Sequence, residues 1–416
     1  MASTSLDQPD VTTPSLYLDG IPHDRFAKMR NAPGLTWHPY EASGFWAVTR
    51  HADIKECSKR SEDFSSGIGH TNLWDLEADA LEARRSILDM DAPEHTRLRR
   101  LLAKAFTPKA IRVWEDLTRE IAAELLDDYL EAGGGDWVEM VAAPLPIRVI
   151  LNILGVPVED ADFLVELSNY IIEGTSDQMS LAPDAYGNTT ELRLLPFASP
   201  ASHALFEYGE RIADERRAEP REDMVTLLVQ LEDEGGKMSH NEFKNLFHAL
   251  ILAGNETTRT AITHGAMAFT DHPDQWQRLV DDPHLLYQGV EEVLRWGTPL
   301  IHMRRTAAVD TELGGTQIAK GDKVVMWYSS SNRDDTVFED PFTFDVGRDD
   351  NDHQAFGGGG PHFCLGAFLA RMEITVLLEE MMARNMSFDS RGEPQRASSN
   401  FVHGILSLDL EVSSLD

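Results

Sequence analysis

The chain has 416 residues and a formal net charge of −33, with 42% hydrophobic and 26% charged residues. These proportions are typical of a globular protein in water, and the strong negative charge disfavours nonspecific binding to nucleic acid or anionic lipid. No apolar run is long enough to span a bilayer. Two cysteines in so long a chain argue against a disulfide framework and indicate a reducing compartment, which predicts a cytoplasmic protein.

The N-terminal part of the chain alternates between polar and apolar segments. Residues 1–14 are polar and lack the basic and apolar pattern of a secretory signal, so we expect a flexible leader. Residues 45–49 favour a strand and residues 50–58 a helix. Residues 65–86 show no clear period, and a loop of this length is often functional or mobile.

A helix is expected to begin at residues 91–95, where Pro93 suits the first turn. His95 and Arg99 then share one face at i, i+4 spacing, as in many exposed helix pairs. Basic residues gather in the same stretch against the sign of the whole chain, namely Arg97, Arg99, Arg100, Lys104, Lys109 and Arg112. This stretch is either a solvated helix face or a docking patch for an acidic protein partner.

Helical patterns follow at residues 109–130, 146–154, 158–173 and 201–217. The connection between the last two, residues 174–200, is rich in Gly, Pro, Ser and Thr and carries scattered apolar residues. Both a substrate lid and a variable surface loop have this composition.

The next strong signal is a capping box at Ser239 and Glu242, which opens a helix that runs to about Thr270. Its thick apolar face indicates that this helix crosses the core. Residues 253–257 within it read Ala-Gly-Asn-Glu-Thr, which is unusual for a buried helix interior. A threonine hydroxyl that bonds to the preceding turn bends a helix and opens space for a water or a ligand. The alternative is a simple kink with the glutamate at the surface.

A further amphipathic helix carries Glu292 and Arg295 as Glu-x-x-Arg, which alone is a common surface ion pair. Residues 298–303 then lead into Arg304 and Arg305, and residues 323–328 favour a strand.

The most informative stretch is residues 356–367, which read Phe-Gly-Gly-Gly-Gly-Pro-His-Phe-Cys-Leu-Gly-Ala. Cys364 precedes an apolar helical run, and the N-terminus of a helix favours the thiolate form. The glycines let backbone amides come close to the sulfur and let a flat, bulky group lie against the chain. Such a thiolate suits a soft metal or the axial position of a haem iron.

Three other interpretations of Cys364 are open at this point. A buried structural cysteine is the commonest role of a free cysteine, and a run of glycines also occurs in phosphate-binding loops. A phosphate loop would place Lys and Ser or Thr after the last glycine, where this chain has Cys and Leu. Zinc would need further ligands at suitable spacing, and only the distant Cys57 remains.

Taken together, these motifs resemble those of the cytochromes P450, and the resemblance covers the chain from about Ser15 onward. Phe356 lies one residue further from Cys364 than in the commonest P450 loop because of an extra glycine. A branch of bacterial P450s that act on sterol side chains and methyl-branched lipids has a similar longer loop. The resemblance implies the P450 fold, mostly α with a smaller β-rich portion, in a single haem domain over residues 15–416.

The resemblance also implies roles for individual residues. Cys364 would be the axial ligand of the haem iron, and Glu256 and Thr257 would deliver protons to bound dioxygen. Glu292, Arg295 and Arg348 would form a structural ion-pair core. The further cofactor contacts implied are His95, Arg99, Ala253, Gly254, Arg305, Phe356, Gly357, His362 and Gly366, of which Gly254 would leave room over the haem. Candidate substrate contacts, each of which is equally compatible with an ordinary core position, are Leu73, Trp74, Leu250, Leu300, Ile301 and Phe401.

The activity implied is hydroxylation of an unactivated C–H bond in a hydrophobic, isoprenoid-like substrate: a sterol side chain, a methyl-branched lipid or a terpene. The cofactor would be haem b, with dioxygen as co-substrate. Electrons from NAD(P)H would arrive through a ferredoxin and its reductase, docked near the basic residues and the Cys364 loop, because no flavin domain follows. A monomer without nucleic-acid or membrane partners is expected. The alternatives are a tailoring oxidase with a larger polar substrate and a haem protein for electron transfer or sensing.

Overall fold

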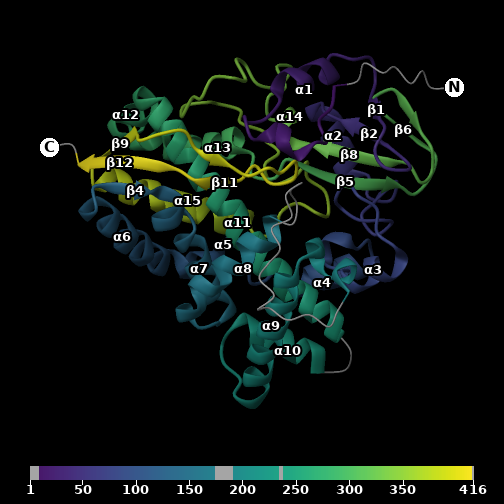
Figure 1. Ribbon diagram of the computed structural model, residues 1–416, viewed down its shortest axis with the longest axis horizontal. Coiled ribbons are helices and arrows are strands. Elements are labelled where there is room, and N and C mark those ends of the chain that lie inside the picture. Colours follow the sequence, from purple (N-terminus) through teal and green to yellow (C-terminus); the bar gives the residue numbers. More distant parts are fainter. Residues whose placement is uncertain (1–8, 174–190, 234–237, 415–416) are drawn as a thin grey trace.

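The computed structural model describes residues 9–173, 191–233 and 238–414. Helices fill one part of the molecule, and the largest sheet lies at the other end (Figure 1). The expected fold, mostly α with a smaller β-rich portion, is confirmed. Among the described residues, no helix combines the length and the apolarity that crossing a membrane requires.

The long helix α11 (His240–Asp271) runs through the centre of the helical part (Figure 1). It contacts α7 (Pro144–Leu154), α9 (Pro200–Ala218), α13 (Leu286–Gly297) and α15 (Ala367–Ala383). The predicted capping box forms, since the Ser239 hydroxyl accepts from the Glu242 amide while the Glu242 carboxylate accepts from the Ser239 amide. Both bonds satisfy N–H groups that the start of a helix leaves unpaired.

The other helices cover this centre and connect it to the sheets. They are α1 (His23–Arg30), α2 (His51–Lys59), α3 (Ala78–Ala83), α4 (Glu94–Leu102), α5 (Pro108–Ile111), α6 (Glu115–Glu131), α8 (Ala161–Glu173), α10 (Met224–Asp233), α12 (Pro273–Asp281) and α14 (Tyr328–Ser331). The helices expected from periodicity at 146–154 and 201–217 thus appear with small shifts at their ends. The one expected at 109–130 is instead divided into α5, a 3-10 turn (Arg112–Trp114) and α6, and the one expected at 158–173 begins with a 3-10 turn (Val158–Asp160) before α8.

The main sheet has five strands in the order β1-β2-β8-β5-β3. Their bounds are β1 (Thr36–His38), β2 (Phe45–Val48), β8 (Lys323–Trp327), β5 (His302–Ala307) and β3 (Phe64–Ser65). Only β2 and β8 pair in parallel, whereas β8 and β5 are antiparallel and place Arg305 opposite Val324. A second sheet joins β4 (Gly134–Asp136), β12 (Asp409–Ser414) and β9 (Met386–Ser390). Two smaller pairs are β6 (Thr311–Leu313) with β7 (Thr316–Ile318) and β10 (Gln395–Arg396) with β11 (Ile405–Ser407).

Two sequence expectations are refined by the structure, and a third falls mostly outside the described residues. The expected loop at 65–86 contains the short helix α3, whose six residues are too few to show a period. The expected leader is packed from Val11 onward, because that side chain is fully buried and its carbonyl accepts from the Tyr17 hydroxyl at 2.8 Å. Most of the connection at 174–200 lies outside the described residues, so the lid interpretation is not examined by the structure.

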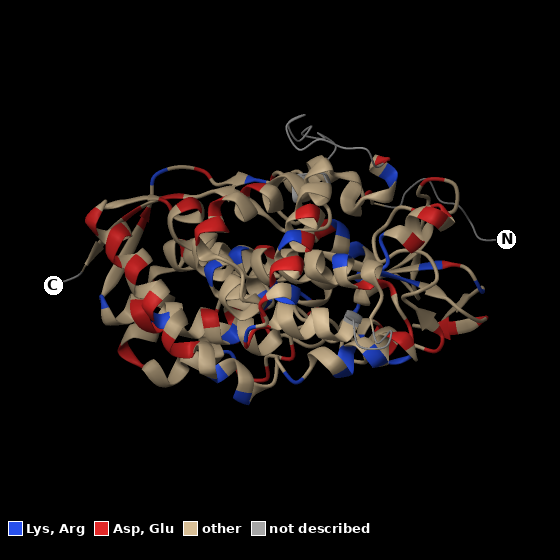
Figure 2. Cartoon of the chain, turned by 90° about the horizontal axis from the view of Figure 1, so that it is seen from below, with Lys and Arg blue, Asp and Glu red and all other residues tan. Residues whose placement is uncertain are grey.

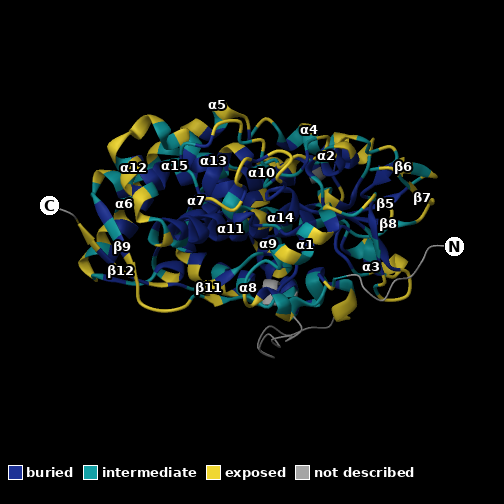
Figure 3. Ribbon diagram, turned by 90° about the horizontal axis from the view of Figure 1, so that it is seen from above, coloured by how far each residue is buried: buried dark blue, intermediate teal, exposed yellow. Residues whose placement is uncertain are grey.

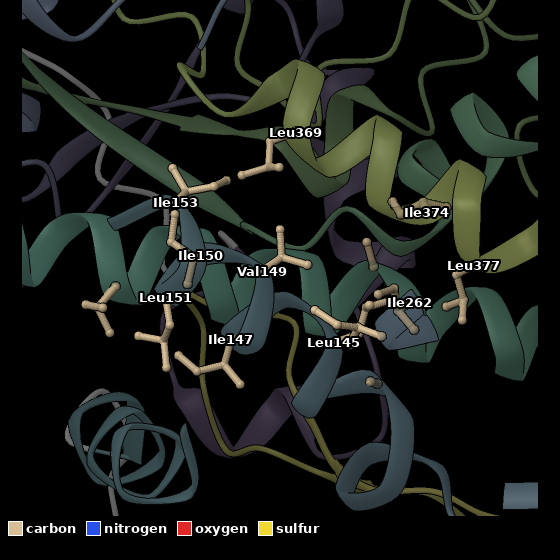
Figure 4. Packing of buried hydrophobic residues seen from close by; sticks show 14 of the residues in the cluster. Leu145, Ile147, Val149, Ile150, Leu151, Ile153, Ile262, Leu369, Ile374 and Leu377 are labelled. Carbon is tan, nitrogen blue, oxygen red and sulfur yellow. The ribbon is translucent and has the colours of Figure 1, made fainter. Parts of the chain in front are cut away.

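The largest apolar core surrounds α7, which is buried along almost its whole length (Figures 3 and 4). Gly254 on α11 is needed at this contact, because a Cβ there would come within 2.9 Å of the Ile150 Cγ1 atom on α7. The missing side chain of Gly254 therefore lets two core helices approach each other. Acidic residues are spread over the surface helices and predominate on the part of the molecule that contains α6 (Figure 2).

Candidate functional site

The loop that precedes α15 is held in shape by its glycines. Gly357, Gly359 and Gly360 have positive φ angles of 92°, 92° and 74°, a conformation that other residues rarely adopt. A Cβ on Gly360 would lie 2.1 Å from the carbonyl oxygen of Ser58 at the end of α2, so this loop packs directly on backbone. Within the loop, the Cys364 amide donates to the Phe356 carbonyl at 3.1 Å.

Cys364 is a free cysteine whose side chain is accessible although protein surrounds it. Burial raises the pKa of its thiol, while the Gly366 amide and the positive charges of Arg99 and Arg371 act in the opposite direction. An accessible sulfur inside the protein, next to cations and a backbone donor, is arranged to meet a ligand and not to pack as a core residue. Cys57, by contrast, is buried in the core cluster beside the main sheet.

Four nitrogen-bearing side chains gather beside this loop: His95, Arg99, Arg305 and His362. We call them the cationic quartet after the two arginines, which carry its positive charge. The rings of His95 and His362 lie 4.0 Å apart. Burial is the largest cause that lowers the pKa of His362 to about 2, followed by the charges of Arg305, His95 and Arg99. Arg99 also donates to the carbonyl of Phe363, one residue before the cysteine.

No described carboxylate forms an ion pair with Arg99 or Arg305. The neighbouring Arg304 is different, because its Nη1 atom pairs with Asp75 at 2.8 Å and also donates to the Trp74 carbonyl. The structure thus separates two adjacent arginines that the sequence does not distinguish. Arg304 pairs with a carboxylate of the same chain, whereas Arg305 belongs to a buried positive group that can bind an anion.

The centre of α11 carries a second unusual surface. Ala253 is exposed, and Leu250, Gly254 and Thr257 are partly exposed, although the helix is otherwise largely buried. These positions have i, i+3, i+4 and i+7 spacing and so form one stripe on the helix. The Thr257 hydroxyl donates to the Ala253 carbonyl at 2.8 Å, the bond to the preceding turn that its sequence context suggests.

Glu256 lies next to this stripe but is itself buried, with 6% exposure. Its Oε1 atom accepts from Arg259 Nη1 at 3.2 Å, and the same nitrogen donates to the Asn169 side chain on α8 at 2.5 Å. Burial raises the pKa of Glu256, and the charge of Arg259 lowers it less. A buried carboxyl with a raised pKa holds its proton more readily than an exposed one, which suits a group that takes up and releases protons.

The structure brings Glu292, Arg295 and Arg348 together. Arg295 makes two bonds of 2.7 Å to the Glu292 carboxylate, and Arg348 Nε lies 3.2 Å from it. Arg295 and Arg348 also donate to carbonyls in the segment between α14 and the cysteine loop, including those of Asn332, Pro341 and Glu339. This group, which we call the ion-pair core, holds that segment in place.

The six candidate substrate contacts fall into two sets. Leu300 and Phe401 lie on adjacent segments, joined by the bridge from Leu300 to Val402 and by the bond from the Ile301 amide to the Phe401 carbonyl at 2.8 Å. Leu250, Leu300 and Trp74 keep accessible surface. Leu73 and Ile301 have 0% exposure in a core cluster with Trp327, so they have no surface to offer a ligand.

A metal centre made of protein ligands is not present in the described part of the chain, where no three or more His, Cys, Asp or Glu side chains come together suitably. The accessible sulfur, the uncompensated cationic quartet and the accessible stripe on α11 instead suit a large group with negatively charged substituents. Haem b has this chemistry, with an iron for the sulfur and two propionates for the cations. The residues present therefore fit that cofactor.

Comparison with known proteins shows the family of this chain. The sequence profile of the family described as Cytochrome P450 matches residues 12–410. A steroid C26-monooxygenase of Rhodococcus jostii is 38% identical, over 95% of this chain and 83% of its own. A methyl-branched lipid omega-hydroxylase of Mycobacterium bovis is 37% identical, over 94% of this chain and 91% of its own. The solved structure of a Mycobacterium marinum cytochrome P450 in complex with pseudoionone has a TM-score of 0.86 and 36% identity, covering 98% of this chain and 100% of that one.

The fold and the site define a haem enzyme of the monooxygenase class. The chain belongs to the cytochrome P450 family. As a P450 monooxygenase it uses haem b and dioxygen, with electrons that come from NAD(P)H through partner proteins.

Proposed function

We propose that this P450 hydroxylates an unactivated C–H bond of a hydrophobic, isoprenoid-like substrate: a sterol side chain, a methyl-branched lipid or a terpene. The observation that carries this proposal is the near-full-length similarity to relatives named for a steroid and for a methyl-branched lipid, at almost equal identity. The structural neighbour in complex with pseudoionone supports the same class of ligand.

The side chains that would contact this substrate are apolar. We assign substrate contacts to Leu250 on α11, to Leu300 and Trp74, and to Phe401. Phe197, which the sequence did not single out, joins them because its ring lies 6.2 Å from that of Phe401. Apolar and aromatic walls with few polar groups suit a hydrocarbon chain and give a polar substrate no partners.

In this proposal Cys364 would ligate the haem iron, and the cationic quartet would hold the propionates through charge-assisted hydrogen bonds. When bound, the haem supplies the oxygen activation and C–H oxidation that no amino-acid side chain performs. The thiol of Cys364 must lose its proton to ligate the iron, and the Gly366 amide and Arg99 favour that loss.

We propose that Glu256 and Thr257 move protons into the site. Glu256 can carry a proton because burial raises its pKa, while Arg259 fixes its carboxylate at the edge of the stripe. Thr257 now donates to the Ala253 carbonyl, so its hydroxyl must rotate before it can donate towards the cofactor. The two side chains would thus pass a proton in sequence, from the carboxyl to the hydroxyl.

We propose that an acidic ferredoxin docks where α4 and α5 flank the Cys364 loop. Arg100, Lys104, Lys109 and Arg112 are exposed there and form no ion pair with a described residue. Phe363 and Phe368, with exposures of 37% and 48%, add apolar surface close to the cysteine. An apolar centre with a basic rim suits a negatively charged electron carrier. A cytoplasmic reductase would reduce this carrier with electrons from NAD(P)H.

An optical titration of the purified ferric protein tests the substrate class. The probe is cholest-4-en-3-one, and the control is androst-4-ene-3,17-dione, which has the same ring system without the side chain. We expect a saturable shift of the Soret band with the first compound and a much weaker one with the second, because the side chain must enter the site. Equal responses, or none to either compound or to pseudoionone, would contradict the proposal.

A further inference from the structure

A second group of charges lies beside the ion-pair core, between α13 and α15. Glu291, the residue before Glu292, accepts from Arg371 Nε at 2.5 Å and from its Nη2 atom at 2.7 Å. The side chain of Glu291 is 8% exposed and that of Arg371 26% exposed. Bidentate pairing of this kind fixes the plane of the guanidinium group. Neither residue stands out in the sequence.

His353 completes this group, and its hydrogen bonds define its tautomer. The Ala355 amide donates to His353 Nδ1 at 3.2 Å, so Nδ1 is the acceptor and the ring proton lies on Nε2. That Nε2 group then donates to Glu291 Oε2 at 3.1 Å. Burial raises the pKa of Glu291, but the bonds from Arg371 and His353 outweigh it and lower the pKa to about 2. Glu291 is therefore a carboxylate, and it pairs with the positive charge of Arg371.

The guanidinium of Arg371 faces the cysteine loop. Its carbon lies 4.5 Å from the centre of the Phe356 ring, a cation–π contact. The same ring lies 5.9 Å from that of His353 and 6.3 Å from that of Phe363. The carbonyl of Phe356 accepts the amide of Cys364 at 3.1 Å. One rigid path thus leads from α13 through Arg371 and Phe356 to the backbone of the cysteine.

We propose that Arg371, held by Glu291, which His353 holds in turn, is a positioning residue that fixes Phe356 at the start of the Cys364 loop and sets the reduction potential of the haem. One-electron reduction of the iron by the partner protein adds a negative charge to the site. The positive charge of Arg371 favours that step, and the negative charge of Glu291 opposes it. This inference depends on the haem of the family and not on the proposed substrate.

The test is a spectroelectrochemical titration of the haem-loaded protein, in which the ferrous fraction is measured at fixed applied potentials. Arg371→Gln removes the positive charge, so the potential should shift to more negative values. Glu291→Gln removes the negative charge and should shift it to more positive values. The double variant, which removes both charges, should return close to the wild type. Because the two single variants have opposite signs, Glu291→Gln alone tests the proposal if Arg371→Gln does not fold.

Two further variants distinguish the effect of the Arg371 charge from its mechanical support of the helices. Arg371→Lys keeps the charge and should keep a potential close to that of the wild type. Arg119→Gln is the matched control. Arg119 of α6 also holds α15, through bonds of 2.5 and 2.9 Å to Glu379 and Glu380, but these two residues lie near the end of α15 that is remote from the loop. This variant should leave the potential unchanged.

The result that would overturn the proposal is equally specific. If both single variants lower thermal stability while the potential stays at the wild-type value, Arg371 only braces α13 against α15. Shifts of the same sign in Arg371→Gln and Glu291→Gln would also contradict it, because loop distortion and not charge would then set the potential. The absorption band of the ferrous carbon monoxide complex reports in each variant whether the thiolate ligand is retained.

Discussion

Two buried groups of charged residues in this protein differ in whether the protein supplies their counter-charge. In the ion-pair core, Glu292 meets Arg295 and Arg348, and the remaining donors reach backbone carbonyls. In the cationic quartet, Arg99 and Arg305 lie close to two histidines and have no described acidic partner. Both groups are costly to bury. The first is compensated by the protein, whereas the second would be compensated by the negatively charged cofactor that we propose it binds.

The largest effect near the quartet is expected from replacing Cys364. Cys364→Ser should abolish the absorption band of the thiolate-ligated ferrous carbon monoxide complex completely, because a neutral hydroxyl is a poor ligand for this iron. The measurement is the reduced-plus-carbon-monoxide difference spectrum. Cys57→Ser is the control and should keep the band. A Cys364→Ser protein that retained it would contradict the assignment.

Substitutions in the ion-pair core should change the stability of the folded protein. Glu292→Gln leaves two buried arginines without their carboxylate and should destabilise the protein by about 3–5 kcal/mol. Denaturant unfolding followed by circular dichroism measures this. Glu124→Gln is the control, because Glu124 pairs with Arg148 at 2.9 Å but is 58% exposed. It should cost less than about 1 kcal/mol. Equal effects of the two substitutions would show that burial of the ion-pair core does not matter.

The stripe on α11 should lie between these extremes, because we propose that the hydroxyl of Thr257 serves in proton transfer and contributes little to packing. Thr257→Ala should lower the product formed per NAD(P)H by about tenfold and raise hydrogen peroxide correspondingly, since a positioned proton donor contributes about 10²–10⁴ to a rate. Thr258→Ala removes a buried hydroxyl from the next position on the helix and serves as the control. Unchanged coupling in Thr257→Ala would remove Thr257 from the relay.

The exposed basic residues on α4 and α5 also lack acidic partners among the described residues. Because solvent screens their charges, substituting them should have the smallest effect on function. The double variant Arg100→Glu with Lys109→Glu should raise the apparent KM for an acidic ferredoxin by about tenfold at low salt, and less as the ionic strength rises. Lys320→Glu, on the exposed turn between β7 and β8, is the charge-matched control. A change that does not depend on salt would argue against docking at α4 and α5.

The sequence predicted the elements whose pattern is strong and local. The capping box at Ser239 placed the start of α11, and the Phe356 and Cys364 motif located the cysteine loop. The fold class and the haem chemistry followed from the resemblance that these motifs carry. The Thr257 bond to the preceding turn was also foreseeable, because it links residues four positions apart.

Other features depend on contacts between distant segments and left no pattern to read. The short helix α3 has too few residues for a period. Leu73 and Ile301 are buried in a core cluster that they share with Trp327 of β8. Glu291 and Arg371 are 80 positions apart, and nothing in the sequence distinguishes Glu291 from its neighbour Glu292. For the same reason the sequence did not show that Arg304 has an acidic partner and Arg305 has none.

The central claim is that the quartet keeps its charge uncompensated for the cofactor, and Arg305→Gln tests it most directly. Two quantities are measured on this variant, the rate at which haem transfers to excess apomyoglobin and the unfolding free energy of the haem-free protein. We predict that haem leaves about ten to a hundred times faster, because a charged hydrogen bond contributes about 1.5–3 kcal/mol. The haem-free variant should be at least as stable as the wild type, because a buried, unpaired charge has been removed. Unchanged haem retention together with a destabilised haem-free protein would contradict the account.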